Sequence, residues 1–137
     1  MAIAKCKGMK LQHTVSMSLA DIAQLTAISH DGSESMTFDS TTLDGSVYKT
    51  YAQTGYSEPG SVTAEGFFDP ALAGHQAITD LIATPADNAM KIIYADAGTT
   101  NQSFTSAGVK FAMTGAMDDG LKFNVTYKVD GDAGWPT

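Results

Sequence analysis

The sequence contains no arginine, because all eight basic residues are lysines. Against them stand 15 acidic residues, so the formal net charge is −7. Arginine is the side chain that best forms paired hydrogen bonds with phosphates and base edges. Its absence from an acidic chain argues against a protein that binds nucleic acid tightly. The charge is also uneven, since residues 1–10 hold three lysines and no acid, which leaves fifteen acids against five lysines, or −10, in the remainder.

Cysteine occurs once, at Cys6, which excludes an internal disulfide framework and favours a reducing site of synthesis. No apolar run approaches the roughly 20 residues of a membrane-spanning helix, and residues 11–20 are too polar for a signal peptide. Hydrophobic residues still make up 43% of the 137 residues, enough to bury a core. We therefore expect a single domain over 1–137 that does not associate with membranes.

Patterns for catalysis or metal binding are also missing. There is no nucleophile elbow and no phosphate-binding glycine loop. Asp118 and Asp119 stand beside Gly120 and fit a turn, while Asp130–Asp132 lacks the later ligands of a calcium loop. The histidines lie far apart and match no metal-ligand spacing: His13, His30 and His75. The sequence thus favours a protein without enzymatic activity, and it predicts no cofactor and no metal.

The strongest structural signal is a hairpin over residues 108–129. Apolar and polar residues alternate strictly over 121–129 and again over 109–114, with an Asp-Asp-Gly turn between them. Such alternation is typical of half-buried strands. The apolar parity is expected to face the core, namely Val109, Phe111, Leu121, Phe123 and Val125.

One helix is predicted at about residues 70–83, with Asp69 as its N-cap and Pro70 in its first turn. Ile78 and Ile82 share its buried face, and His75 at the edge of that face is interpreted as a packed, hydrogen-bonded histidine. Further strands are predicted over 34–39, 61–68, 89–95 and 101–106, whereas residues 18–28 fit either a helix or a strand. Together these elements predict a mainly β fold, a sandwich or barrel-forming sheet with one flanking helix.

Two segments are not assigned to a helix or a strand. Residues 1–12 are expected to be a flexible N-terminal segment. Residues 40–60 are rich in Ser, Thr, Gly and Tyr, which predicts a long loop. Loops of that length in a small domain are usually functional or disordered.

Several segments in order resemble siphophage major tail proteins of the lambda-like tail tube family. They are IAQLTAIS at 22–29, MTFDSTTLD at 36–44, GYSEPGSVT at 55–63 and GFFDP at 66–70, just before the predicted helix. The resemblance covers about residues 20–130 and favours a strand over 18–28. Many relatives have an acidic residue followed directly by glycine at this point, whereas here Pro59 stands between Glu58 and Gly60. No C-terminal immunoglobulin-like domain, as some relatives carry, is expected.

The resemblance implies a structural virion protein of the tail tube, made in the host cytoplasm. Such subunits form hexameric rings in which one sheet of each continues into a barrel around a lumen. The rings stack on a tape measure protein, meet tail terminator and distal tail proteins, and let double-stranded DNA pass. The 40–60 loop would then contact the next ring through Tyr48, Tyr51, Tyr56 and Glu58. A net negative lumen would be lined by Asp39 and Glu65.

Two other classes remain open. A type VI secretion tube or a tail terminator protein would be a related ring former. A monomeric β-sandwich binding module would instead use the loop tyrosines as a ligand-binding cluster. A small hydrolase has the least support, because the sequence lacks a catalytic triad and a metal set.

Overall fold

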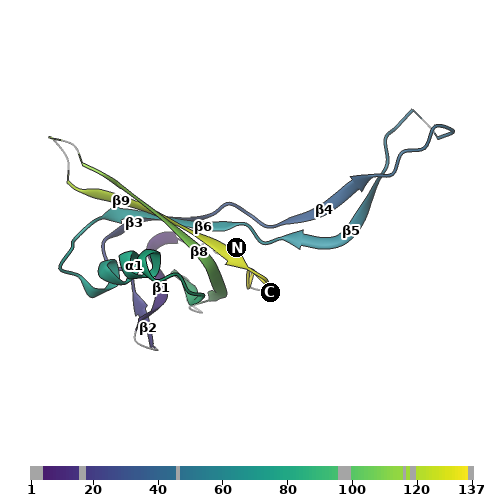
Figure 1. The fold of residues 1–137 in the computed structure, drawn as a ribbon. Helices are drawn as coiled ribbons and strands as arrows, with labels where there is room; N and C mark the ends of the chain where they lie inside the picture. Colours follow the sequence, from purple (N-terminus) through teal and green to yellow (C-terminus); the bar gives the residue numbers. More distant parts are fainter. Residues whose placement is uncertain are drawn as a thin grey trace.

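The structure, a computed structural model, describes residues 5–15, 18–45, 47–95, 100–115, 117 and 120–135, with Lys5 and Cys6 described by their backbone alone. Within these ranges the chain is mainly β with one short helix, as Figure 1 shows. No helix among the described residues has the length and apolar character to cross a membrane. In chain order the elements are β1 (Lys5–Val15), β2 (Ser18–Asp21), β3 (Leu25–His30), β4 (Glu34–Asp39), β5 (Tyr51–Glu58), β6 (Ser61–Phe67), α1 (Ala73–Ala83), β7 (Asn88–Ala95), β8 (Asn101–Thr114) and β9 (Lys122–Asp130).

The strands form a seven-stranded antiparallel sheet in the order β2-β1-β7-β8-β9-β6-β3 and a separate β4-β5 pair. Strand β8 joins the two halves of the larger sheet. Its first part, Asn101–Ser106, pairs with β7, and its second part, from Thr105 to Thr114, pairs with β9. The predicted strand over 101–106 and the first hairpin strand are therefore one strand, with a register irregularity between Ser106 and Gly108.

The sheet folds back on itself into a sandwich. Strands β2 and β3 lie at opposite edges of the sheet, yet only residues 22–24 separate them in the chain. The two edges must therefore come close together, and the bend falls in β8. The prediction of one strand over 18–28 is wrong in this detail, because Gln24 turns the chain with a φ of 65° and its carbonyl accepts the N–H of Phe67 (3.1 Å).

The core lies between the two halves of the sheet and beneath α1. Phe123 packs among three other rings, with centroid distances of 4.9 Å to His75, 5.8 Å to Phe111 and 6.2 Å to Phe68. This cluster joins β8, β9 and the helix, so the predicted flanking helix is confirmed. The remaining core is aliphatic or small apart from Tyr127 and Phe104: Leu11, Ile22, Val62, Ala64, Ile78, Met90, Ile92, Val125, Val129 and Ala133.

In the hairpin of β8 and β9, the apolar parity lies toward the core with one exception. Phe123 and Val125 are buried, and the half-buried Val109 and Phe111 pack against the core. Leu121 is 42% exposed, so its assignment to the core is wrong. It precedes the first residue of β9, where its carbonyl accepts the N–H of Phe68 (2.8 Å) beyond the paired strands.

The helix begins three residues later than predicted. Asp69 caps a preceding turn, because its carboxylate accepts the N–H of Ala71 (2.9 Å) and its carbonyl that of Leu72 (3.1 Å). Leu72 is the N-cap of α1. The prediction that Ile82 is buried is wrong, since it is 46% exposed in the last helical turn.

His75 is packed and hydrogen-bonded, as predicted. Its Nδ1 accepts the N–H of Asp69 (3.0 Å) and its Nε2–H donates to the carbonyl of Ala23 (2.7 Å). The ring is fully buried.

The prediction of a flexible start over residues 1–12 is wrong for the described residues from Lys5 onward. Strand β1 lies between β2 and β7, and both Leu11 and His13 are fully buried. Neither ring nitrogen of His13 has a hydrogen-bond partner among the described residues. Burial, with a smaller contribution from nearby His75, lowers the pKa of His13 from 6.5 to about 4.

Candidate assembly surfaces

Residues 34–58 form a hairpin that projects away from the rest of the molecule, as Figure 1 shows. We call this segment the arm, and the seven-stranded sheet with α1 the body. The prediction of a loop over 40–60 is wrong from Tyr51 onward, because β5 pairs with β4 and only residues 40–50 connect them. Both faces of the arm meet solvent, so neither strand shows the alternation that marks a half-buried strand.

The arm has no core of its own. Its seven large apolar and aromatic side chains are between 48% and 109% exposed: Met36, Phe38, Leu43, Val47, Tyr48, Tyr51 and Tyr56. A two-stranded hairpin is marginally stable alone in water, and apolar surface gathered on a projection is typical of an interface. The three tyrosines selected from the sequence thus lie on this exposed surface, as does Glu58 at the end of β5.

Hydrogen bonds between side chains and backbone hold the tip of the arm together. Thr41 donates its N–H to the carboxylate of Asp39 (2.9 Å), and its hydroxyl oxygen accepts the N–H of Thr50 (2.9 Å). Ser40 donates its N–H to the carbonyl of Thr50 (2.9 Å). The hydrogen bonds from Thr41 lower the pKa of Asp39, so this exposed carboxylate stays charged at neutral pH.

The body has two open strand edges on the same half of its sheet. Strands β8, β9, β6 and β3 form a four-stranded half-sheet, and β3 is its outer edge among the described strands. The opposite edge is the second part of β8, since the pairing with β7 ends at Ser106 while β8 continues to Thr114. Open edges are templates for further strands.

The ladder shows which backbone groups point outward at the β8 edge. The backbone N–H of Phe68 donates to the carbonyl of Leu121, and the backbone N–H of Val129 donates to the carbonyl of Gly60. The odd-numbered residues of β9 therefore form their backbone hydrogen bonds with β6. The even residues of β9 therefore bond toward the even residues of β8. The N–H and C=O groups of Val109, Phe111 and Met113 are left pointing out of the sheet.

The outer face of the half-sheet is polar and carries charges of both signs. Lys110, Lys122 and Lys128 point to this face, together with Glu65 and Asp130, because residues paired across the ladder share one side. The structure does not bring the two predicted lumen residues together, since Asp39 ends β4 in the arm and Glu65 lies on β6 of the body.

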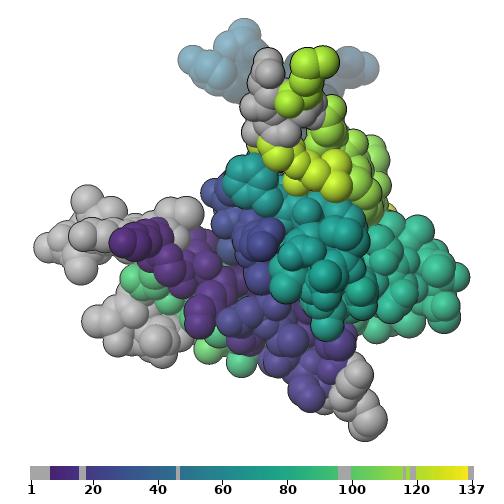
Figure 2. All heavy atoms as spheres, turned by 90° about the vertical axis from the view of Figure 1, so that its left-hand side faces the viewer, coloured from purple at the N-terminus to yellow at the C-terminus, as the bar shows by residue number. Residues whose placement is uncertain are grey.

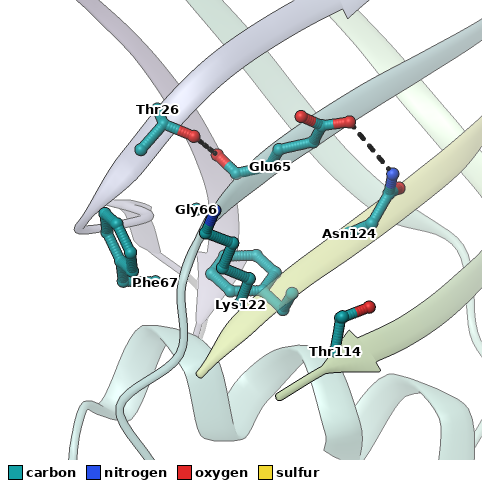
Figure 3. A pocket seen from close by; sticks show the side chains of 8 residues that line it. Thr26, Glu65, Gly66, Phe67, Thr114, Lys122 and Asn124 are labelled. Atoms are coloured by element: carbon teal, nitrogen blue, oxygen red, sulfur yellow. Dashed lines mark hydrogen bonds between the residues drawn. The ribbon is translucent and has the colours of Figure 1, made fainter. Parts of the chain in front are cut away.

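A shallow groove of about 420 Å³ lies at one end of this face, shown in Figure 3. Glu65 is held in place there, since its side chain accepts a hydrogen bond from Asn124 (3.2 Å) and its carbonyl one from Thr26 (3.3 Å). The ammonium of Lys122 lies 5.9 Å from the ring centre of Phe67. This set holds no nucleophile paired with a base, and no group of three potential metal ligands occurs in the described part of the chain.

The groove and the arm lie at opposite ends of the molecule. Figure 2 views the end that carries the β8–β9 hairpin, and the arm recedes behind the body. Asp118 and Asp119, read from the sequence as turn residues, lie outside the described residues. Sequence reasoning did not identify which strands carry the open edges, because a strand's place in a sheet depends on partners distant in the chain.

No protein-family model and no curated protein matches the sequence. Solved structures with the same fold do match over nearly the whole chain. A chain from the tail of an empty GTA particle, refined with C6 symmetry, has a TM-score of 0.75 at 15% identity, covering 98% of this chain and 100% of that one. A chain from the virion of a native gene transfer agent (GTA) particle gives 0.70 at 15% identity, with the same coverage.

A third chain comes from the baseplate of the anti-feeding prophage, solved with six-fold symmetry. Its TM-score is 0.69 at 10% identity, covering 96% of this chain and 94% of that one. The predicted fold class, a mainly β sandwich with one flanking helix, is therefore confirmed, and the fold is shared with these chains from GTA particles and from the anti-feeding prophage baseplate. Among the described strands, the sheet does not close into a barrel within one chain.

Proposed function

We propose that this chain is a structural tail tube subunit of a virion, which polymerises into stacked hexameric rings and has no enzymatic activity. The observation that carries the proposal is the pair of open edges on one four-stranded half-sheet. A half-sheet with two open edges can continue only by pairing with other chains, and closure into a ring removes every edge.

The number of strands suits closure by rotation. Strands β3, β6, β9 and β8 alternate in direction, so the two edge strands run in opposite directions. When copies are related by rotation about an axis along the strands, β3 of one copy meets β8 of the next in antiparallel orientation. The alternation then continues around the ring without a break, which is compatible with a cyclic, head-to-tail assembly. The six-fold symmetry of the similar assemblies supports six copies.

The arm is proposed to join one ring to the next. It projects beyond one end of the body, and its tyrosines can bury area against a neighbouring ring while their hydroxyls remain hydrogen-bonded. Tyr48, Tyr51, Tyr56 and Glu58 are its contact candidates. Burial of these exposed apolar side chains on docking would remove the cost of presenting them to water.

The polar side of the half-sheet is proposed to face the lumen, through which DNA passes without binding. Three lysines and two acids on that side leave a net charge of +1, so this face alone is not negative. The arm adds four acids against one lysine between residues 34 and 58. We therefore assign the negative lining to Asp39 of the arm together with Glu65, so that repulsion keeps the polyanion from binding. The tape measure, terminator and distal tail proteins are the expected further partners.

A related ring former is the second candidate, supported by the similarity to a baseplate chain. A baseplate or terminator protein would stop at one ring, whereas a tube protein stacks without limit. A monomeric binding module has less support, because it leaves both edges and the arm without a role.

Met113 offers a sharp test of ring closure. Its side chain is 48% exposed and its N–H points out of the β8 edge, so proline there removes a donor that the folded monomer does not use. We expect Met113→Pro to give folded monomers that form no rings. Met113→Thr, which keeps the N–H, should assemble normally. Rings from Met113→Pro at the wild-type concentration would contradict pairing through this edge.

A further inference from the structure

Two glycines bend the chain where the arm leaves the body. Gly32, between β3 and β4, has a φ of 98°, and Gly60, between β5 and β6, has a φ of 86°. Both connections of the arm therefore turn at the same level, in a conformation that glycine adopts without strain. A hairpin joined to the body through two such bends needs other contacts to fix its direction.

Hydrogen bonds tie these two connections to each other. Asp31 donates its N–H to the carbonyl of Ser61 (3.0 Å), and its carboxylate accepts the N–H of Ser61. The carbonyl of Pro59 accepts from His30 Nε2 (2.9 Å) and from the hydroxyl of Ser33 (3.1 Å). We call residues 30–33 and 59–61 the arm base.

The segment that follows β9 also reaches the arm base, close to where Val129 donates its backbone N–H to the carbonyl of Gly60 (3.2 Å). We call residues 131–135 the strut. The strut is anchored at Ala133, which is 5% exposed and whose carbonyl accepts from the buried Gln102 side chain (2.8 Å). Gln102 is in turn fixed by the hydroxyl of Tyr94 (2.7 Å).

Position 134 must be glycine for the strut to lie where it does. Gly134 has a φ of 70°, and a Cβ there would stand 1.9 Å from the carbonyl oxygen of Ser103 on β8. Its N–H donates to the carboxylate of Asp132 (2.8 Å), which closes the turn. The strut thus packs directly against β8, the strand that carries Gln102.

Trp135 links the strut to the arm base. Its indole Nε1–H donates to Ser33 Oγ (2.8 Å), and its ring lies 4.5 Å from that of His30, tilted by 56°. A continuous path of contacts therefore runs from the core through Gln102 and the strut to Ser33, at the point where the arm turns.

We propose that the strut is a positioning device that sets the direction of the arm, with Trp135 as its contact residue. The inference rests on the proposed function, in which the arm docks on a neighbouring ring. An arm already held in its docking direction loses less conformational freedom on binding, and this preorganisation strengthens assembly.

The direction of the arm can be measured without any assembly. Spin labels at Gln53 on β5 and Asp80 on α1, both exposed, report the distance between arm and body, with the single Cys6 replaced by serine in all variants. At concentrations below assembly, we expect a narrow distance distribution for the otherwise wild-type chain and a broad one for Trp135→Ala. Trp135→Phe, which keeps the ring contact and loses the hydrogen bond, should lie between them.

Ile82→Ala is the matched control, because Ile82 is 46% exposed against 45% for Trp135 and lies on α1, which Figure 1 shows away from the arm. It should leave the distribution narrow. An equally narrow distribution for Trp135→Ala would overturn the proposal. Melting temperatures of all variants, measured alongside, separate a change in arm direction from a loss of the fold.

Assembly provides the second readout. Losing one hydrogen bond and one ring contact should raise the critical concentration for stacking about ten-fold in Trp135→Ala. An unchanged critical concentration with a broadened distribution would refute the role in assembly. If the wild-type chain itself never assembles, the proposed function fails, while the distance distributions still decide whether the strut directs the arm.

Discussion

Replacing Phe123 by alanine tests the assignment of the core directly. The ring is 2% exposed and stands among Phe68, His75 and Phe111 at centroid distances of 4.9–6.2 Å. Three surrounding rings on a sheet and a helix leave little room for collapse into the space. We therefore expect Phe123→Ala to lower the free energy of unfolding by about 3–5 kcal/mol, at the high end for a large-to-small change. Such a loss is a large part of the stability of a domain this size.

Leu121→Ala is the matched control, two residues away on the same parity but 42% exposed. It should cost about 1 kcal/mol or less. Both variants are to be unfolded in urea at concentrations below assembly, so that subunit contacts do not add to the measured stability. A loss below about 1 kcal/mol for Phe123→Ala, or equal losses for the two variants, would mean that the parity of β9 is wrongly assigned.

The remaining predictions concern the arm, the acid response and the lumen. Replacing residues 36–56 by Asn-Gly should leave the body folded and able to form rings but unable to stack them, and normal tubes in electron micrographs would refute the stacking role. The free energy of unfolding should fall by about 3 kcal/mol as the pH drops from 6.5 to 4, because His13 takes up a proton at a higher pH in the unfolded state than in the folded state. Chemical unfolding at a series of pH values should show a weaker dependence on pH for His13→Met. An undiminished slope in that variant would assign the acid response elsewhere. Virions carrying Asp39→Lys and Glu65→Lys should eject DNA more slowly, and an unchanged rate with both residues facing the lumen would contradict the negative lining.

The strands that could be predicted from the sequence are those with one buried face. Strand β9 alternates strictly because Phe123 and Val125 meet the core while Lys122 and Asn124 meet solvent. The arm strands escaped notice in part because both faces are exposed, and β5 was therefore taken as loop. Strand β8 was divided into two because the kink near Gly108 interrupts its alternation.

Other errors came from residues whose environment depends on distant parts of the chain. His13 occupies a core position in β1, on the same face as Met9 and Leu11. Because histidine is polar, the alternation of apolar residues that marks this strand is not visible in the sequence. Leu121 has the right parity but lies beyond the paired residues of β9. The arm tyrosines were found because clustered aromatics in a polar segment are visible in composition. The positions of the open edges and of the strut depend on tertiary pairing, which no local pattern reveals.

Whether the subunits polymerise can be seen by electron microscopy of the purified chain over a wide range of concentration, including conditions that promote tail assembly. We expect six-fold rings that stack into hollow tubes as the concentration rises. Particles that remain single subunits at every concentration would contradict this expectation.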